Sequence, residues 1–240
     1  MPRFFSEHCN EQSCYIYGPD ASHISKSLRM KIGESLTVCD QKGTDYDCVI
    51  ESIDPNVIRL KVLGKKATLT EPNVQLTLYM ALPKSDKMEL IIQKCVELGI
   101  TRIVPVITSR CISRPDDKTF QKKIERYQKI AYEAAKQSGR GVVPEICDKI
   151  NFKKAIEIAS KDDTAMIFYE NGGEDISSFL KNASKTISIF VGAEGGFDSS
   201  EISLAIESGV LPATLGPRIL RCETAPISAT SIIMYLTGNM

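Results

Sequence analysis

The N-terminal part of the chain consists of short apolar and β-branched runs separated by turn-forming residues, a pattern typical of a small all-β unit. Turn chemistry is strongest at residues 40–43 and 54–56. One helical segment, residues 21–30, interrupts the runs, with Gly33 as its expected stop. The close spacing of the runs predicts a small β-barrel. Its expected strands are residues 13–17, 35–39, 46–53 and 57–63.

From residue 74 onwards, apolar strands alternate with amphipathic helices, which predicts a parallel α/β domain. The polar, proline-containing segment 65–73 is the natural linker, so we expect the boundary near Pro72, with domains at 1–72 and 73–240. The expected strands are residues 74–81, 102–107, 165–169 and 187–191.

Residues 119–140 form the longest expected helix. Its apolar positions recur at helical spacing, at Phe120, Ile124, Tyr127, Ala131 and Ala134 or Ala135. Lysines and arginines occupy the other positions, at Lys122, Lys123, Arg126, Lys129 and Lys136. Such a charged face is most often only solvated. With Lys84, Lys87, Lys94, Arg110 and Arg114 from neighbouring segments, it can also form a phosphate-binding surface.

Composition restricts the class of protein without indicating its activity. Apolar residues make up 42% and charged residues 25% of the chain, as in soluble globular proteins. No apolar run reaches the length of a signal peptide or a membrane helix, so we expect a cytoplasmic protein. The eight cysteines include no C-x-x-C pair and there are two histidines, so we expect reduced thiols and no metal site. Because the net charge is zero, a nucleic acid would have to bind a local basic face.

The segment VGAEGGF joins an apolar strand to a helix and contains Gly192, Gly195 and Gly196 around Glu194. Glycines permit positive φ angles and let a ligand approach the backbone closely. Asp198 and Glu201 have the spacing of a capping box, which predicts where the helix begins. A plain strand-to-helix turn remains an equal alternative. The glycine spacing fits neither a dinucleotide fingerprint nor a P-loop.

A second segment, LGPRILRCETA, leads into the last helix. Thr224 is expected to cap that helix, and Pro226 is tolerated in its first turn. Residues 227–236 are small or apolar on nearly every face, which predicts burial by the core and by a second subunit. Arg218 and Arg221 are either solvated surface residues or part of a site, and their position before a buried helix favours a site.

Six segments, in the same order along the chain, resemble the RsmE family of 16S ribosomal RNA (uracil-N3)-methyltransferases in the SPOUT superfamily. They are PRFF, HISKSLRMKIGE, KSDKMELIIQKCVELGI, ERYQKIAYEAAKQSGRGVVPEI, VGAEGGF and LGPRILRCETA. The resemblance implies a PUA-like barrel that helps to hold RNA, followed by an α/β domain with a trefoil knot. It also implies a homodimer that binds S-adenosylmethionine in the knot and acts on 16S rRNA of the small ribosomal subunit.

The resemblance further implies that three loops hold the cofactor. The family usually has proline where this chain has Ala193, which removes rigidity but no functional group. We expect Gly195 to lie against the cofactor at a positive φ angle. The implied cofactor residues are Tyr169, Glu170, Gly192, Ala193, Gly195, Gly196, Leu215, Gly216, Ile219, Leu220, Arg221 and Thr224.

Methyl transfer from a sulfonium requires alignment of the methyl group with the acceptor nitrogen and no metal. Loss of the uridine N3 proton makes Glu194 and Glu223 candidate bases, and Arg221 ranks first as the group that stabilises charge on the uracil. Two alternatives are a SPOUT enzyme acting on another RNA position and an RNA-binding assembly factor without catalysis. The expected RNA-binding residues are Arg3, Arg29, Lys84, Lys87, Arg110, Arg114 and Arg140.

Overall fold

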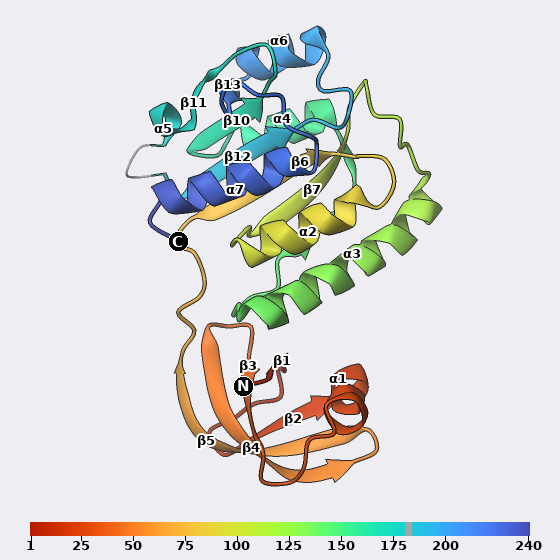
Figure 1. Ribbon diagram of the computed structural model, residues 1–240, viewed down its shortest axis with the longest axis vertical. Helices are drawn as coiled ribbons and strands as arrows, with labels where there is room; N and C mark the ends of the chain where they lie inside the picture. The colour runs from red at the N-terminus through yellow and green to blue at the C-terminus, as the bar shows by residue number, and fades with distance from the viewer. Residues whose placement is uncertain (181–183) are drawn as a thin grey trace. The chain divides into compact units, whose positions relative to one another are not determined.

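The computed structural model describes residues 1–180 and 184–240, and these form two compact units (Figure 1). The first unit comprises Met1–Glu71 and Ala135–Val143, and the second comprises Pro72–Ala134 and Pro144–Met240. The segment 135–143 contains the last residues of the long helix Asp117–Ser138 and belongs to the first unit, whereas the rest of that helix belongs to the second. No pattern in the sequence indicated this assignment.

The first unit is built on a five-stranded sheet in the order β1-β3-β4-β5-β2. Alternate residues along these strands are buried, and Phe4, Ile16, Leu36, Ile58 and Leu60 are among those that form its core. The paired strands β4 and β5 are longer than expected, and β5 includes the first residues of the expected linker. The strands are β1 (Arg3–Phe5), β2 (Ser13–Tyr17), β3 (Ser35–Cys39), β4 (Thr44–Asp54) and β5 (Val57–Ala67).

The helical segment of this unit begins and ends earlier than the sequence predicts. It consists of α1 (Gly18–Ser22) followed by a π-helical turn, η1 (His23–Ser27). Pro19 lies in the first turn, where its missing N–H leaves no hydrogen bond unmade. Arg29 has a φ angle of 52°, which is incompatible with a right-handed helix, so the helix cannot continue to residue 30.

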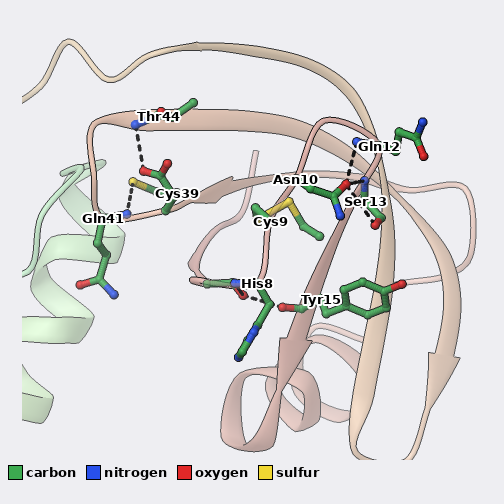
Figure 2. The surroundings of a disulfide bond; sticks show 12 residues. His8, Cys9, Asn10, Gln12, Ser13, Tyr15, Cys39, Gln41 and Thr44 are labelled. Atoms are coloured by element: carbon green, nitrogen blue, oxygen red, sulfur yellow. Dashed lines mark hydrogen bonds between the residues drawn. A yellow bond between two sulfur atoms is a disulfide. The ribbon is translucent and has the colours of Figure 1, made fainter.

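A disulfide joins Cys9 to Cys14 and corrects the expectation that every cysteine is reduced (Figure 2). The two Cα atoms are 4.1 Å apart because the chain folds back on itself between the two residues. The other six cysteines are free. Burial raises the pKa of Cys48 and of Cys95 to about 12, so these thiols stay protonated and act as packing residues.

The second unit contains a fully parallel sheet, as the alternation of strands and helices predicts. Its order is β11-β13-β10-β12-β6-β7-β8, with β9 also beside β7. The strands are β6 (Gln75–Ala81), β7 (Arg102–Ile107), β8 (Glu145–Ile146), β9 (Ile150–Asn151), β10 (Thr164–Phe168), β11 (Glu174–Asp175), β12 (Thr186–Val191) and β13 (Leu211–Thr214).

Helices cover this sheet, and Figure 1 shows α2 and α7 side by side in front of it. Helices α4 and α6 contribute Phe152 and Ile202 to a core shared with Phe190 of the central strand β12. The expected apolar face of α3 is confirmed, since Phe120, Tyr127 and the alanines are buried. The helices are α2 (Lys87–Glu97), α3 (Asp117–Ser138), α4 (Phe152–Ala159), α5 (Ile176–Phe179), α6 (Ser199–Glu207) and α7 (Thr224–Leu236).

Candidate active site

Three loops meet at one edge of the parallel sheet. Strand β10 lies between β13 and β12, so the loops that follow these three strands emerge next to one another. They surround a cavity of about 930 Å³. Its lining residues are Lys87, Phe168, Tyr169, Glu170, Gly172, Val191, Gly192, Ala193, Glu194, Gly195, Gly196, Ala213, Thr214, Leu215, Gly216, Pro217, Arg218, Ile219, Leu220, Arg221, Cys222 and Ala225.

The loop after β12 turns tightly on two glycines. The N–H of Gly196 donates to the carbonyl of Ala193 at 3.0 Å, and Gly196 has a φ angle of 64°. A Cβ atom on Gly192 would lie 3.0 Å from the Cα of Gly196, so a side chain there would collide with backbone. The expectation for Gly195 was wrong, because Gly195 is not at a positive φ angle. The chain reverses one residue later than expected.

Hydrogen bonds fix this loop from both sides. The predicted capping box is confirmed: the Asp198 carboxylate accepts from the N–H of Ser200, and Glu201 accepts from the N–H of Asp198. Glu201 also accepts two hydrogen bonds from Ser109, which follows β7. Arg110 donates to the carbonyl of Gly195 at 3.2 Å and pairs with Asp198 at 3.3 Å. These contacts tie the loop to the start of α6 and to the segment after β7.

A lysine joins two acidic residues beside the cavity. The Lys87 ammonium lies 2.9 Å from the Glu194 carboxylate and 3.4 Å from that of Glu223. It also donates to the sulfur of Cys222 at 3.5 Å. The N–H of Lys84 donates to both oxygens of Glu194, at 3.2 and 3.3 Å. The start of α2 is thus connected to the loop after β12 and to the segment before α7.

These contacts keep the cluster charged. Burial, the largest single influence, raises the pKa of Glu194, but the contact with Lys87 and the hydrogen bonds from the N–H groups of Glu194 and Lys84 together outweigh it, so the pKa is lowered. Hydrogen bonds from its own N–H, and then from Cys222 and Lys87, lower the pKa of Glu223. The hydrogen bond to Glu194 raises the pKa of Lys87. At neutral pH the cluster therefore holds two carboxylates and one ammonium.

Two arginines and an apolar residue of the segment before α7 face solvent at the cavity. Arg218 and Arg221 are exposed and line it, and Ile219 is 87% exposed. Thr224 is not the cap of α7, because Glu223 precedes the helix and no side chain caps it. The carbonyl of Arg221 instead accepts from the N–H groups of Thr224 and the next residue.

The structure brings together nearly all the residues that the sequence assigned to the cofactor. Each of them lines the cavity except Thr224. Of the candidate catalytic residues, Glu194 and Arg221 line it, and Glu223 reaches it through Lys87. The sequence placed Lys87 on the RNA-binding surface and missed its position here. The sequence analysis also left out Phe168, Gly172, Val191, Ala213, Thr214 and Ala225, several of which end a strand.

Three basic residues expected at an RNA surface have structural roles inside the first unit. Arg3 forms two hydrogen bonds with Asp45, the shorter at 2.6 Å. Arg140 pairs with Glu71 at 2.6 Å, and its side chain is 3% exposed. Lys136, expected on the solvated face of α3, is buried against Asp20 and lies over the ring of Phe4. Burial leaves none of the three free to contact phosphates.

The remaining basic residues are placed differently. Arg29 and Lys84 are exposed, and Arg110 is partly engaged by the glycine loop. The Arg114 guanidinium donates to the carbonyls of Thr108, Ser109 and Cys111, so it stabilises the loop after β7. Arg29, Lys84 and Arg110 therefore remain as candidates for RNA contact.

Neither a metal site nor a membrane helix is found in the part of the chain that the structure describes. Within residues 1–180 and 184–240, His, Cys, Asp and Glu side chains do not gather in a group of three or more that could hold a metal ion. Over the same residues, each helix is too short or too polar to cross a membrane.

Comparisons with known proteins agree with this architecture. The model of the RNA methyltransferase domain family matches residues 70–234, and that of the RNA methyltransferase PUA domain matches residues 16–63. The ribosomal RNA small subunit methyltransferase E of Bacillus subtilis is 34% identical over 250 residues, which cover 99% of this chain and 97% of the relative.

Solved structures show the same similarity. A ribosomal RNA small subunit methyltransferase E from Neisseria gonorrhoeae, bound to S-adenosyl methionine, has a TM-score of 0.89 at 32% identity over 98% of both chains. A protein from Legionella pneumophila, solved with the bound cofactor SAM, has a TM-score of 0.88 at 28% identity, covering 97% of this chain and 96% of the other. The chain therefore belongs to the RNA methyltransferase family of ribosomal RNA small subunit methyltransferase E.

Proposed function

We propose that this protein transfers a methyl group from S-adenosylmethionine to N3 of a uridine in the 16S ribosomal RNA of the small subunit. One observation carries the proposal: the three loops that the family resemblance assigns to the cofactor surround a single cavity. The relatives named methyltransferase E, and the Neisseria structure with its bound S-adenosyl methionine, support the same cofactor and substrate class.

The residues at the cavity fit this cofactor. Its volume, about 930 Å³, lies within the range of small-molecule sites. Gly192 leaves open the space that a Cβ would fill beside Gly196, so a ligand can lie against backbone groups. Tyr169, Leu215 and Leu220 offer apolar surface for a purine ring, and the Glu170 carboxylate offers an acceptor for hydroxyl groups. When bound, the cofactor supplies a methyl group on a positively charged sulfur.

The acceptor chemistry assigns roles to the charged residues. N3 of uridine carries a proton and lies on the pairing edge, so the base must be unpaired and the proton must leave as the bond from N3 to the methyl carbon forms. Negative charge then develops on the uracil oxygens. Lys87, Arg218 and Arg221 are cations that line the cavity, and we assign Arg221 and Lys87 the role of stabilising this charge. Glu194 and Glu223 hold Lys87, and Glu194, which lines the cavity, is the candidate to accept the proton.

We further propose a homodimer, because α7 keeps an apolar face in solvent. Ile232, Tyr235 and Leu236 are 38%, 73% and 44% exposed, respectively.

We also propose the trefoil knot that the family resemblance implies. Strands β13 and β12 lie on opposite sides of β10, and the segment that follows β13 runs back to the cavity beside the loop that follows β12, which supports the knot. We place the protein in the cytoplasm with the ribosome. We keep Pro72 as the functional boundary between the RNA-holding domain and the methyltransferase domain.

Purified small subunits from a strain that lacks the gene test the proposal. They are incubated with the protein and S-adenosylmethionine labelled in the methyl group, and the labelled nucleoside is then identified. We expect 3-methyluridine in 16S rRNA. Label in another nucleoside would indicate a methyltransferase with a different target. Cofactor binding without any label would indicate an assembly factor that has lost catalysis.

A further inference from the structure

Three aromatic rings lie together on the surface of the first unit. The rings of Tyr15 and Tyr17 are stacked, with centroids 6.4 Å apart and planes inclined by 18°. The His8 ring meets Tyr17 edge to face, with centroids 5.1 Å apart. Tyr17 is 51% exposed, and His8 is also exposed. Exposure of this much aromatic surface is unfavourable in water unless a partner covers it.

The position of β2 in the sheet explains why these rings face outwards. Cys14 and Ile16 are buried in the core, so the alternating residues Tyr15 and Tyr17 lie on the opposite face of the strand. The neighbouring strand β5 adds positive charge to the same face. Arg59 is directly opposite Tyr15, Lys61 is opposite Ser13, and both basic side chains are exposed.

The chain segment that carries His8 is held beside β2. The N–H of Tyr15 donates to the carbonyl of His8 at 3.0 Å. The Ser6 hydroxyl donates to the carbonyl of Tyr15 at 2.5 Å and accepts from the N–H of His8 at 3.2 Å. Figure 2 shows the disulfide of Cys9 next to these contacts. The three rings are therefore ordered in advance, which lowers the entropic cost of binding.

We propose that His8, Tyr15 and Tyr17 form a base-stacking surface for unpaired ribosomal RNA, with Arg59 and Lys61 contacting the backbone phosphates. Planar rings beside cationic side chains are the arrangement that holds single-stranded nucleic acid, because every base has a stacking face and every linkage a negative charge. Arg59 pairs with Glu51 at 2.8 Å on the surface. Because an exposed ion pair contributes little stability, an RNA phosphate can take the place of Glu51 when RNA binds. The proposal rests on the proposed action on ribosomal RNA and adds a binding site outside the methyltransferase domain.

The test compares two double variants of the full chain. Tyr15→Leu with Tyr17→Leu removes the aromatic faces, whereas Tyr15→Phe with Tyr17→Phe keeps them and removes only the hydroxyls. The probes are a single-stranded RNA oligonucleotide and a duplex of the same length, each with a fluorescent label, and binding is measured by anisotropy without cofactor. Titration with S-adenosylmethionine then checks that the second unit of each variant is intact.

We expect the leucine variant to bind the single strand about tenfold or more weakly, and the phenylalanine variant to bind it like the parent. The parent should prefer the single strand to the duplex. Equal affinity of the leucine variant and the parent would overturn the proposal, as would equal losses in both variants. Intact small subunits serve as a third probe: if the leucine variant loses affinity only for them, a ribosomal protein is the partner and the proposal fails. An absence of methyl transfer by the parent would instead contradict the proposed function and leave this binding result unaffected.

Discussion

Lys87 and Glu194 lie 107 positions apart in the chain, yet the lysine ammonium is 2.9 Å from the glutamate carboxylate. Lys87 begins α2, which follows the central strand β6, and Glu194 lies in the glycine loop after the adjacent strand β12. Because neighbouring parallel strands end at the same edge of the sheet, the two side chains meet beside the cavity. Glu223 joins them from the segment before α7, so one lysine holds two of the elements that shape the site.

Replacing Lys87 with methionine should slow methyl transfer by about tenfold or more, because the variant loses a cation that stabilises developing charge. Lys87 also lowers the pKa values of Glu194 and Glu223. Without it, both pKa values rise towards those of ordinary carboxyls, so the acidic limb of the rate profile should move to higher pH. Initial rates measured across the pH range check both effects.

Lys84→Met is the matched control, because Lys84 contacts Glu194 through its backbone N–H, which the substitution keeps. Because Lys84 is also a candidate RNA contact, the comparison is made at saturating RNA, where we expect this variant to show the parent's pH profile and turnover number. If Lys84→Met and Lys87→Met have the same effect, the charge cluster beside the cavity does not contribute to catalysis.

Gly192→Ala should weaken S-adenosylmethionine binding by about tenfold or more, while Gly195→Ala should have a smaller effect. A Cβ on Gly192 would meet the backbone of Gly196 at 3.0 Å, whereas one on Gly195 would meet the Arg110 side chain at 3.1 Å. Arg110 lies on a separate loop, which can give way by a few tenths of an ångström. Gly192 and Gly196 belong to the same tight turn, which cannot relax without a cost of about 1–3 kcal/mol. Calorimetric titration measures both affinities, and a thermal melt confirms that both variants fold. A larger loss for Gly195→Ala would show that the loop is constrained at a different residue.

The sequence predicted much of this architecture because it depends on local patterns. Strand β7 has the expected bounds, and the Asp198 capping box begins α6 where the spacing of Asp198 and Glu201 indicates. The three loops were found through the family resemblance, and parallel strand order explains why they meet. The motif VGAEGGF, however, cannot show which glycine reverses the chain. The φ angle of Gly196 depends on its hydrogen bond to Ala193.

Residues with distant partners could not be predicted from the sequence. Lys136 and Arg140 belong to a stretch of charged residues that resembles a solvated surface. Both are buried because Asp20 and Glu71, which are far away in sequence, supply their counter-charges. The sequence likewise groups Lys87 with other lysines of a phosphate-binding surface, and only the order of the strands places it beside Glu194. The disulfide between Cys9 and Cys14 could not be predicted either, because it forms where the chain folds back on itself and no sequence motif marks that turn.

Acid should destabilise the first unit through Asp45. Burial raises the pKa of Asp45, but hydrogen bonds from Arg3 and Thr68 outweigh it, so the pKa is lowered. A carboxyl whose pKa is depressed by folding contributes stability above its unfolded pKa, which is about 4, and loses it as the pH falls through the folded value. We therefore expect the melting temperature to decrease once the pH drops below about 4. The Asp45→Asn variant should have a lower melting temperature than the parent at neutral pH, and its melting temperature should change less as the pH is lowered. Equal acid sensitivity in both proteins would assign the effect to other groups.

Tyr235→Arg should prevent dimer formation at micromolar concentration, because it places a charge in the middle of the exposed apolar face of α7. Sedimentation velocity measures the change from dimer to monomer. Ile206→Arg is the matched control, since Ile206 is 47% exposed on a different helix, α6. The parent sedimenting as a monomer would contradict the proposed dimer directly.

Mass mapping of the methylated nucleosides in 16S rRNA, from cells with and without the gene, tests the central claim most directly. The cavity at Gly192, Glu194 and Arg221 is proposed to serve one reaction on one base. Deletion should therefore remove a single methyl group from N3 of one uridine, and the intact gene should restore it while an Arg221→Ala copy should not. An unchanged methylation pattern in the deletion strain, or loss of a methyl group from a ribose or another base, would contradict the account.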